Sequence, residues 1–138
     1  MKIKYASVAI DDDALFLDIF EFLAHQVECL ELIQTYTDWK DASVGLMTHK
    51  PDILFLDIEM PGFDYEEMTR NFGYLPKIVV VSAHLHFDIS KLNFKVTKFV
   101  SKPIRDSRHL ESIVREVMDI NQLDFCTHAL MAKFANKN

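Results

Sequence analysis

The sequence holds little of what several classes of protein require. It contains two cysteines, Cys29 and Cys126, which match no metal-ligand spacing and are too few for a disulfide scaffold. We therefore expect reduced thiols in or near the core. The net charge is −6, and no stretch is rich in lysine and arginine. Because nucleic-acid binding needs a basic surface, the composition argues against direct binding of DNA or RNA.

Long apolar segments are absent as well. No apolar run approaches the roughly 18 residues that a membrane helix needs, and the apolar part of the N-terminal MKIKYASVAI is too short for a signal peptide. We therefore expect a cytoplasmic protein without membrane contact. The length of 138 residues fits one domain, and a hydrophobic fraction of 49% is ample for one packed core.

Short apolar runs alternate with amphipathic segments along the chain. The runs predict five strands, over Tyr5–Ile10, 30–35, Ile53–Leu56, 78–81 and 96–100. The segments between and after them predict five helices, over 14–27, from a cap at Asp38 or Asp41 to 49, over 64–71 with Gly73 ending it, over 86–93, and from Asp106 or Ser107 to 120. Strands that alternate with helices predict a parallel sheet covered on both faces.

The first predicted helix rests on apolar residues that recur at helical spacing. These residues are Leu15, Phe16, Ile19, Phe20, Leu23 and Val27. Such a pattern is typical of an amphipathic helix that packs on a core.

Polar side chains follow four of the predicted strands. Right-handed crossovers bring the carboxyl ends of parallel strands to one edge of the sheet, where ligand sites form. The groups expected there are Asp11, Asp12, Asp13, Asp57, Ser82 and Lys102. A helix cap explains Asp13 equally well, but Asp57 follows a strand that is apolar throughout. The set as a whole therefore indicates a site.

The chemistry of these groups is that of phosphoryl transfer. Carboxylates held close together cannot all stay ionised without a cation. Asp11, Asp12 and Asp57 offer the hard oxygen ligands that suit Mg²⁺, and a carboxylate can attack phosphorus to form an acyl phosphate. Lys102 would supply a second cation and the Ser82 hydroxyl a hydrogen bond to the phosphoryl oxygens.

Four segments resemble the motifs of response-regulator receiver domains, namely AIDDDALFL, PDILFLDIEMPG, IVVVSAH and FVSKPI. The resemblance covers about residues 3–120. It is closest to the receivers of LytTR-type regulators, because the interval between MPG and the fourth strand is short and the segment VTKFVSKPI is similar. It implies a doubly wound α/β fold, (βα)5, with a CheY-like sheet order of 2-1-3-4-5. It also implies a two-component phosphorylation switch that is not an enzyme in its own right.

The resemblance implies roles for the acidic residues. Asp57 would accept a phosphoryl group from a sensor histidine kinase or a phosphotransfer protein. Asp11, Asp12 and Asp57 would hold Mg²⁺ together with the backbone carbonyl of Glu59. Because the sequence has no basic patch, it would act on transcription only through a DNA-binding output domain. No part of the sequence resembles such a domain.

Other roles are implied for the residues that respond to the phosphate. Ser82 and Lys102 would contact the phosphoryl oxygens, and the peptide bond before Pro103 would be cis. Phe99 would swing inward when Ser82 moves. The face built by the last two predicted helices and the strand between them would change shape, and it would then control an output domain or partner, or pair two copies of the chain.

Two further residues lie close to these motifs. Glu59 comes two positions after Asp57, and His84 two positions after Ser82. We hypothesise that their bulk and charge affect how readily water attacks the acyl phosphate. The alternative, that both are ordinary solvated residues, stays open.

Two other functions fit parts of the pattern. A Mg²⁺-dependent phosphohydrolase of the haloacid-dehalogenase type also uses an aspartate nucleophile, but after its first strand and in an Asp-x-Asp pattern, whereas Asp57 follows the third strand. A degenerate receiver that only binds proteins would be expected to lack an acid, the hydroxyl or the lysine, and all of these are present.

The end of the sequence has a different character. We expect a receiver domain over 1–120 and a helical extension or the start of a linker over 121–138. Leu123, Cys126, Leu130 and Phe134 recur at helical spacing, which predicts a helix that packs on its own domain, mediates dimerisation or begins a further segment. The chain is then a single-domain regulator or an excised receiver, and we favour the second because LytTR-type regulators are usually fused to an output domain.

Overall fold

The protein, described by a computed structural model over residues 3–84 and 92–118, is built around one five-stranded sheet. The strands are β1 (Tyr5–Ile10), β2 (Leu30–Tyr36), β3 (Ile53–Leu56), β4 (Lys77–Ser82) and β5 (Lys98–Ser101). Every neighbouring pair is parallel, and the order is β2-β1-β3-β4-β5. The predicted fold class and strand order are confirmed.

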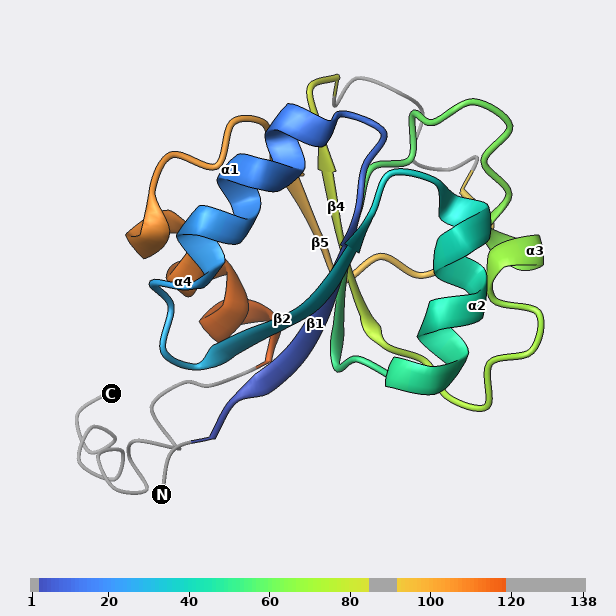
Figure 1. Cartoon of the computed structure of the whole chain (residues 1–138), viewed down its shortest axis with the longest axis horizontal. Helices are drawn as coiled ribbons and strands as arrows, with labels where there is room; N and C mark the ends of the chain where they lie inside the picture. The colour runs from blue at the N-terminus through green and yellow to red at the C-terminus, as the bar shows by residue number, and fades with distance from the viewer. Residues whose placement is uncertain (1–2, 85–91, 119–138) are drawn as a thin grey trace.

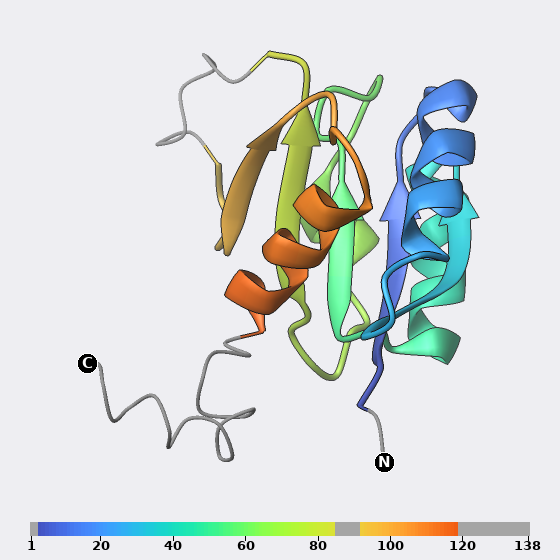
Figure 2. The ribbon, with the colours of Figure 1, turned by 90° about the vertical axis from the view of Figure 1, so that its left-hand side faces the viewer.

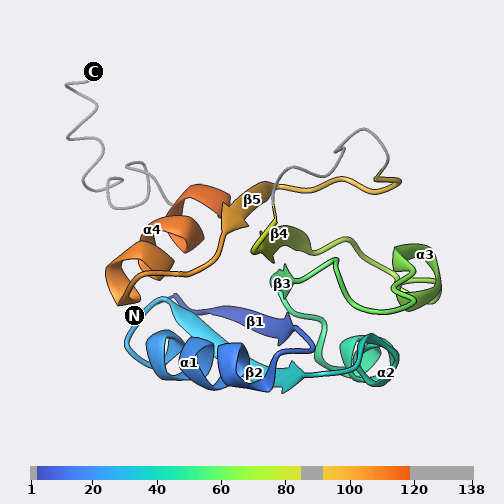
Figure 3. The same ribbon diagram turned by 90° about the horizontal axis from the view of Figure 1, so that it is seen from above.

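Helices cover both faces of the sheet. The helix α1 (Ala14–Ala24) and the helix α4 (Ser107–Val117) pack on one face, and α2 (Trp39–His49) and α3 (Tyr65–Met68) pack on the other (Figures 1 and 3). Two clusters of buried side chains, one for each face, make up the core. All four residues of β3 are buried because both faces are covered, which explains its continuous apolar run.

An aspartate caps the beginning of each of the four described helices. The side chain of Asp13 accepts hydrogen bonds from the amides at the start of α1, and Asp38, Asp64 and Asp106 do the same for α2, α3 and α4. These carboxylates satisfy amides that lack a partner within the helix. The cap of α2 is thus Asp38, and Asp41 lies in the first turn.

The first helix is shorter than predicted. It ends at Ala24 and not at residue 27, because the amides of Gln26 and Val27 donate to the carbonyls of Leu23 and Ala24 in a tightened turn. This turn brings Val27 into the core. The pattern of apolar residues extends past the end of the helix because Val27, which lies in the turn, is also buried.

The outer face of α1 also differs from the expectation that its apolar residues at helical spacing all pack on the core. Leu15 and Ile19 are exposed on the helix, whereas Leu17 and Phe20 are buried. Apolar residues therefore lie on both sides of α1, and periodicity alone did not separate the two faces.

The prediction for the third helix was wrong in its length. The helix α3 spans Tyr65–Met68 and does not reach residue 71. Beyond Thr69, the amides of Arg70 and Phe72 donate to the carbonyls of Glu67 and Thr69, three residues back, so the α-helical pattern does not continue. Gly73 does not end it, and its φ is not in the left-handed region.

A smaller difference concerns the last strand, and two predicted helices lie wholly or mostly outside the described residues. The strand β5 begins at Lys98 and not at residue 96, although the amide of Thr97 donates to the carbonyl of Ile78. The helix predicted over 86–93 lies outside the described residues except for 92–93, which are not helical, and the helix predicted after residue 121 lies outside them entirely. Within 3–84 and 92–118, no helix has the length and apolar character to cross a lipid bilayer.

Candidate metal centre and active site

The ends of the parallel strands meet at one edge of the sheet. The amide of Asp57 donates to the carbonyl of Ile10 at 3.0 Å, and the amide of Lys102 donates to the carbonyl of Ser82 at 2.9 Å. These hydrogen bonds continue the ladders of β1–β3 and β4–β5 by one residue. The amide of Asp11 likewise donates to the carbonyl of Tyr36 at 3.0 Å. The first residues beyond β1, β3 and β5 are therefore fixed by backbone contacts, as parallel topology requires.

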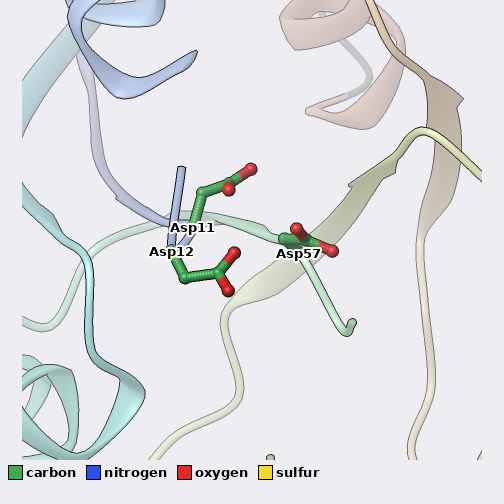
Figure 4. Close-up of side chains that lie close together, drawn as sticks. All are labelled: Asp11, Asp12 and Asp57. Carbon is green, nitrogen blue, oxygen red and sulfur yellow. The ribbon is translucent and has the colours of Figure 1, made fainter. Parts of the chain in front are cut away.

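Three carboxylates lie together at this edge (Figure 4). Asp11 and Asp12 come from the end of β1 and Asp57 from the end of β3. One oxygen from each lies within 4.8 Å of the others. Asp11 is 1% and Asp57 is 7% exposed, whereas Asp12 is exposed. Clustered oxygens of this kind, with one side open to water, suit a hard cation such as Mg²⁺.

The side chain of Lys102 neutralises part of this charge. Its ammonium nitrogen lies 2.7 Å from Oδ2 of Asp11 and 3.6 Å from Oδ2 of Asp57. Oδ2 of Asp11 is buried and has no partner other than this ammonium among the described residues. The ammonium also lies 4.4 Å from the centre of the Phe16 ring, a cation–π contact from α1. The peptide bond between Lys102 and Pro103 is cis, as the resemblance implies.

The protonation of this pair reflects burial and charge together. Burial raises the pKa of Asp11, although the hydrogen bonds from Lys102 and from the amide of Asp13 oppose the change. Burial alone would lower the pKa of Lys102, but the hydrogen bond to Asp11 and the charges of Asp11 and Asp57 outweigh it and raise that pKa. Lys102 therefore stays protonated at neutral pH.

The hydroxyl of Ser82 belongs to a second network at the same edge. Ser82 is fully buried, and its Oγ donates to Oε1 of Glu59 at 3.0 Å. The amide of His84 donates to Oγ of Ser82 at 3.1 Å, and Nδ1 of His84 lies 3.0 Å from the same Glu59 oxygen. The amide of Glu59 in turn donates to Oδ1 of Asp57 at 2.9 Å. A hydrogen-bonded path thus joins Asp57 to Ser82 and His84.

This network was not predicted from the sequence. Glu59 and His84 were singled out by their spacing, but their hydrogen bonds to each other and to Ser82 were not. The signal was present, since β3 and β4 are neighbours and residues shortly after their ends must lie close. The side chains of Glu59 and His84 are 39% and 64% exposed, so water reaches both.

Phe99 lies in β5, opposite Val80 of β4. Its ring is partly buried and packs against the core cluster on the face that α2 and α3 cover. The structure therefore brings Asp11, Asp12, Asp57 and Lys102 into one site. Hydrogen bonds join Ser82, Glu59 and His84 to this site. Phe99 lies in β5, the strand that leads to Lys102.

Comparison with known families gives a clear match. The model of the response regulator receiver domain matches residues 8–115, which include every residue of the site. The match favours a receiver over a phosphohydrolase of the haloacid-dehalogenase type.

Curated relatives carry the same domain. An uncharacterized response regulatory protein of Vibrio cholerae is 29% identical over 78% of this chain and 43% of the relative. LytT of Bacillus anthracis, a sensory transduction protein, is 26% identical over 77% of this chain and 44% of its own length, in line with the LytTR-type resemblance. A protein-glutamate methylesterase/protein-glutamine glutaminase of Hahella chejuensis is 30% identical over 83% of this chain and 34% of that protein. The chain spans less than half the length of these relatives.

Solved structures share the fold. The receiver domain of NarL from Mycobacterium tuberculosis superposes with a TM-score of 0.69 at 20% identity, covering 84% of this chain and 98% of the other. CheY6 of R. sphaeroides, solved with the P1 domain of CheA3, gives a TM-score of 0.68 at 20% identity, covering 85% of this chain and 98% of the other. With the sheet order, the acidic edge and the family match in agreement, the chain belongs to the response-regulator receiver domains of two-component systems.

Proposed function

We propose that the chain accepts a phosphoryl group on Asp57, with Mg²⁺ held by Asp11, Asp12, Asp57 and the backbone carbonyl of Glu59. The observation that carries the proposal is the cluster of three carboxylate oxygens within 4.8 Å of one another, in which the side chain of Asp57 is buried. When bound, Mg²⁺ would neutralise negative charge on the phosphoryl oxygens and on the carboxylates.

The proposed transfer uses the groups of this chain in defined roles. One oxygen of Asp57 attacks phosphorus, the bond from phosphorus to the donor's nitrogen or oxygen breaks, and the leaving group departs with that electron pair. The ammonium of Lys102, 3.6 Å from Asp57, is close enough to bind a phosphoryl oxygen. The chemistry is confined to the chain's own Asp57, so the chain is a phosphoacceptor switch and not an enzyme for a separate substrate.

The switch would begin at Ser82. In the described state its hydroxyl donates to Glu59, and an attached phosphoryl group would offer stronger acceptors. Movement of Ser82 would leave space that Phe99, partly buried against the core, can fill. The phosphate would thereby bias a pre-existing equilibrium between two packings of β5 and its neighbours.

The partners follow from the same role. The proposed donor is a sensor histidine kinase or a phosphotransfer protein, and the solved complex of CheY6 with the P1 domain of CheA3 supports this class. The face of β5, α4 and the segment before β5 would act on an output domain or pair two copies. We place the receiver over 1–120 in the cytoplasm and assign DNA binding to an output domain and not to this chain.

The first test is phosphorylation by a small donor. Incubated with acetyl phosphate and Mg²⁺, the chain is expected to gain one phosphoryl group, seen by intact-mass analysis, and to lose it when hydroxylamine cleaves the acyl phosphate. With excess chelator the gain should fall at least about 100-fold, because the carboxylates then repel the incoming phosphate without a counter-charge. Steady release of phosphate from esters would instead indicate a phosphohydrolase, and no gain without Mg²⁺ binding would indicate a degenerate receiver.

Glu59 and His84 supply a second prediction. Both side chains reach water, and they pair directly beside Ser82. Alanine at both positions is expected to change the first-order rate of dephosphorylation by about tenfold, or about 1.4 kcal/mol in the barrier, since the pair shapes the path of the attacking water.

The decay of the acyl phosphate, followed by mass over time, measures this rate. A Glu31→Ala variant, changed at an exposed residue of β2, serves as the control. Equal rates in the double variant, the control and the parent would show that the pair is only solvated surface.

A further inference from the structure

The helix α1 carries a second apolar face that no described residue covers. Leu15, Ile19 and Phe22 are 67%, 50% and 68% exposed and recur at helical spacing, so they form one outward stripe, here called the α1 stripe. The opposite side of the helix is packed in the core through Leu17 and Phe20. A contiguous exposed stripe of large apolar side chains is typical of an interaction surface.

The neighbouring helix shows that this is particular to α1. The helices α1 and α4 contact each other on the same face of the sheet (Figure 2). The outer residues of α4 are polar, as in Ser112 and Glu116, and Arg115 and Glu111 form an ion pair on it. An apolar segment near this face would therefore pack on α1 and not on α4.

We propose that the segment 119–138 of the same chain docks on the α1 stripe. The sequence after Met118 repeats Leu123, Cys126, Leu130 and Phe134 at helical spacing, which predicts an amphipathic helix in need of an apolar surface. The occupant is thus a segment of this chain whose apolar face matches the stripe in kind and spacing.

The place where the segment begins makes this contact accessible. Both α1 and α4 run from the site edge of the sheet toward the opposite edge (Figure 2). Five residues of chain from Met118 to Leu123 reach up to about 17 Å, whereas packed helices lie about 8–10 Å apart. The segment can therefore turn back and lie antiparallel to α1.

Charge favours the same arrangement. Residues 11–28 contain no lysine or arginine, and the exposed Asp18 and Glu21 are acidic. The last part of the segment carries Lys133 and Lys137 and no acid after Asp124. In the antiparallel arrangement these lysines approach the first half of α1, where Asp18 and the capping Asp13 lie and opposite charges attract.

Disulfide trapping in the full-length chain tests the proposal. Cys126 serves as the native thiol of the segment, Cys29 is replaced by alanine, and a second thiol is placed on the stripe by Ile19→Cys or Phe22→Cys. Under mild oxidation both variants are expected to form an intramolecular disulfide at least tenfold faster than a Ser112→Cys control. This control is informative because Ser112 is exposed on α4 and closer along the chain to Cys126, so a freely moving tether would favour it.

A third change separates docking from chance contact. Adding Leu130→Asp to Phe22→Cys should reduce the rate to that of the Ser112→Cys control, because a charge cannot be buried on the stripe without a partner. Equal rates at all three positions would overturn the proposal. Intermolecular disulfides between stripe cysteines would overturn it as well, by assigning the stripe to a second copy of the chain. None of these readouts depends on phosphorylation.

Discussion

The Asp57→Asn chain is expected to gain no phosphoryl group under the conditions that phosphorylate the parent chain. Asparagine keeps the shape and the oxygen that accepts from the amide of Glu59, but its amide cannot form an acyl phosphate. The fold should persist, since the substitution removes one of three neighbouring negative charges. Intact-mass analysis gives the gain, and urea unfolding should give a midpoint no lower than that of the parent.

An acceptor elsewhere would give a different pattern. His84 and Ser82 lie at the same edge and are the alternatives within reach of the donor. A phosphoryl group on Ser82 would survive hydroxylamine, and one on His84 would be lost with His84→Ala. A gain in Asp57→Asn equal to that of the parent would contradict the proposed acceptor while leaving the receiver fold intact.

Replacing Asp12 with alanine is expected to weaken Mg²⁺ binding by about 100-fold or more. Loss of a group that only supports a ligand already costs about 10- to 100-fold in metal affinity, and Asp12 supplies one of the three carboxylates itself. Without Mg²⁺, the free energy of unfolding of the variant should lie within about 0.5 kcal/mol of that of the parent, because Asp12 is exposed. Calorimetric titration with Mg²⁺ measures the affinity, and the rise of Tm with Mg²⁺ should be lost.

The adjacent residue provides the matched control. Asp13 carries the same charge one position later, but its side chain caps α1 by accepting from the amides of Leu15 and Phe16. Asn is an equally good cap, so Asp13→Asn should leave the helix intact and change Mg²⁺ affinity by no more than about threefold through the lost distant charge. Equal weakening by both substitutions would mean that net charge, and not coordination by Asp12, holds the ion.

Much of the fold could be predicted because its strands are buried. The bounds of β1 and β3 agree with the prediction, since a strand covered on both faces gives a continuous apolar run that stops where the chain reaches water. The position of the site followed from topology, because parallel strands end at one edge. Helix ends were less predictable. They depend on local hydrogen bonds such as those of the Arg70 and Phe72 amides, which a pattern of apolar residues does not contain.

The details of the site depended on contacts between distant segments. The ammonium of Lys102 rests on the ring of Phe16, yet Phe16 entered the sequence argument only as a core residue of the first helix. The bond from Ser82 to Glu59 needs the rotamers of two side chains from different strands. The outward direction of Leu15 depends on where the helix meets the sheet, which apolar periodicity leaves undetermined when a helix is apolar on both sides.

The hydrogen bond between Ser82 and Glu59 affects how much output the unphosphorylated regulator would give. Ser82 is held by a charged acceptor before any phosphoryl group arrives, and such a bond contributes about 1.5–3 kcal/mol. That energy would bias the unphosphorylated chain toward its resting packing by between about 10-fold and about 150-fold. Background output without a stimulus would be low, and a brief or weak stimulus would have to phosphorylate a larger share of the chains before the response rose above noise.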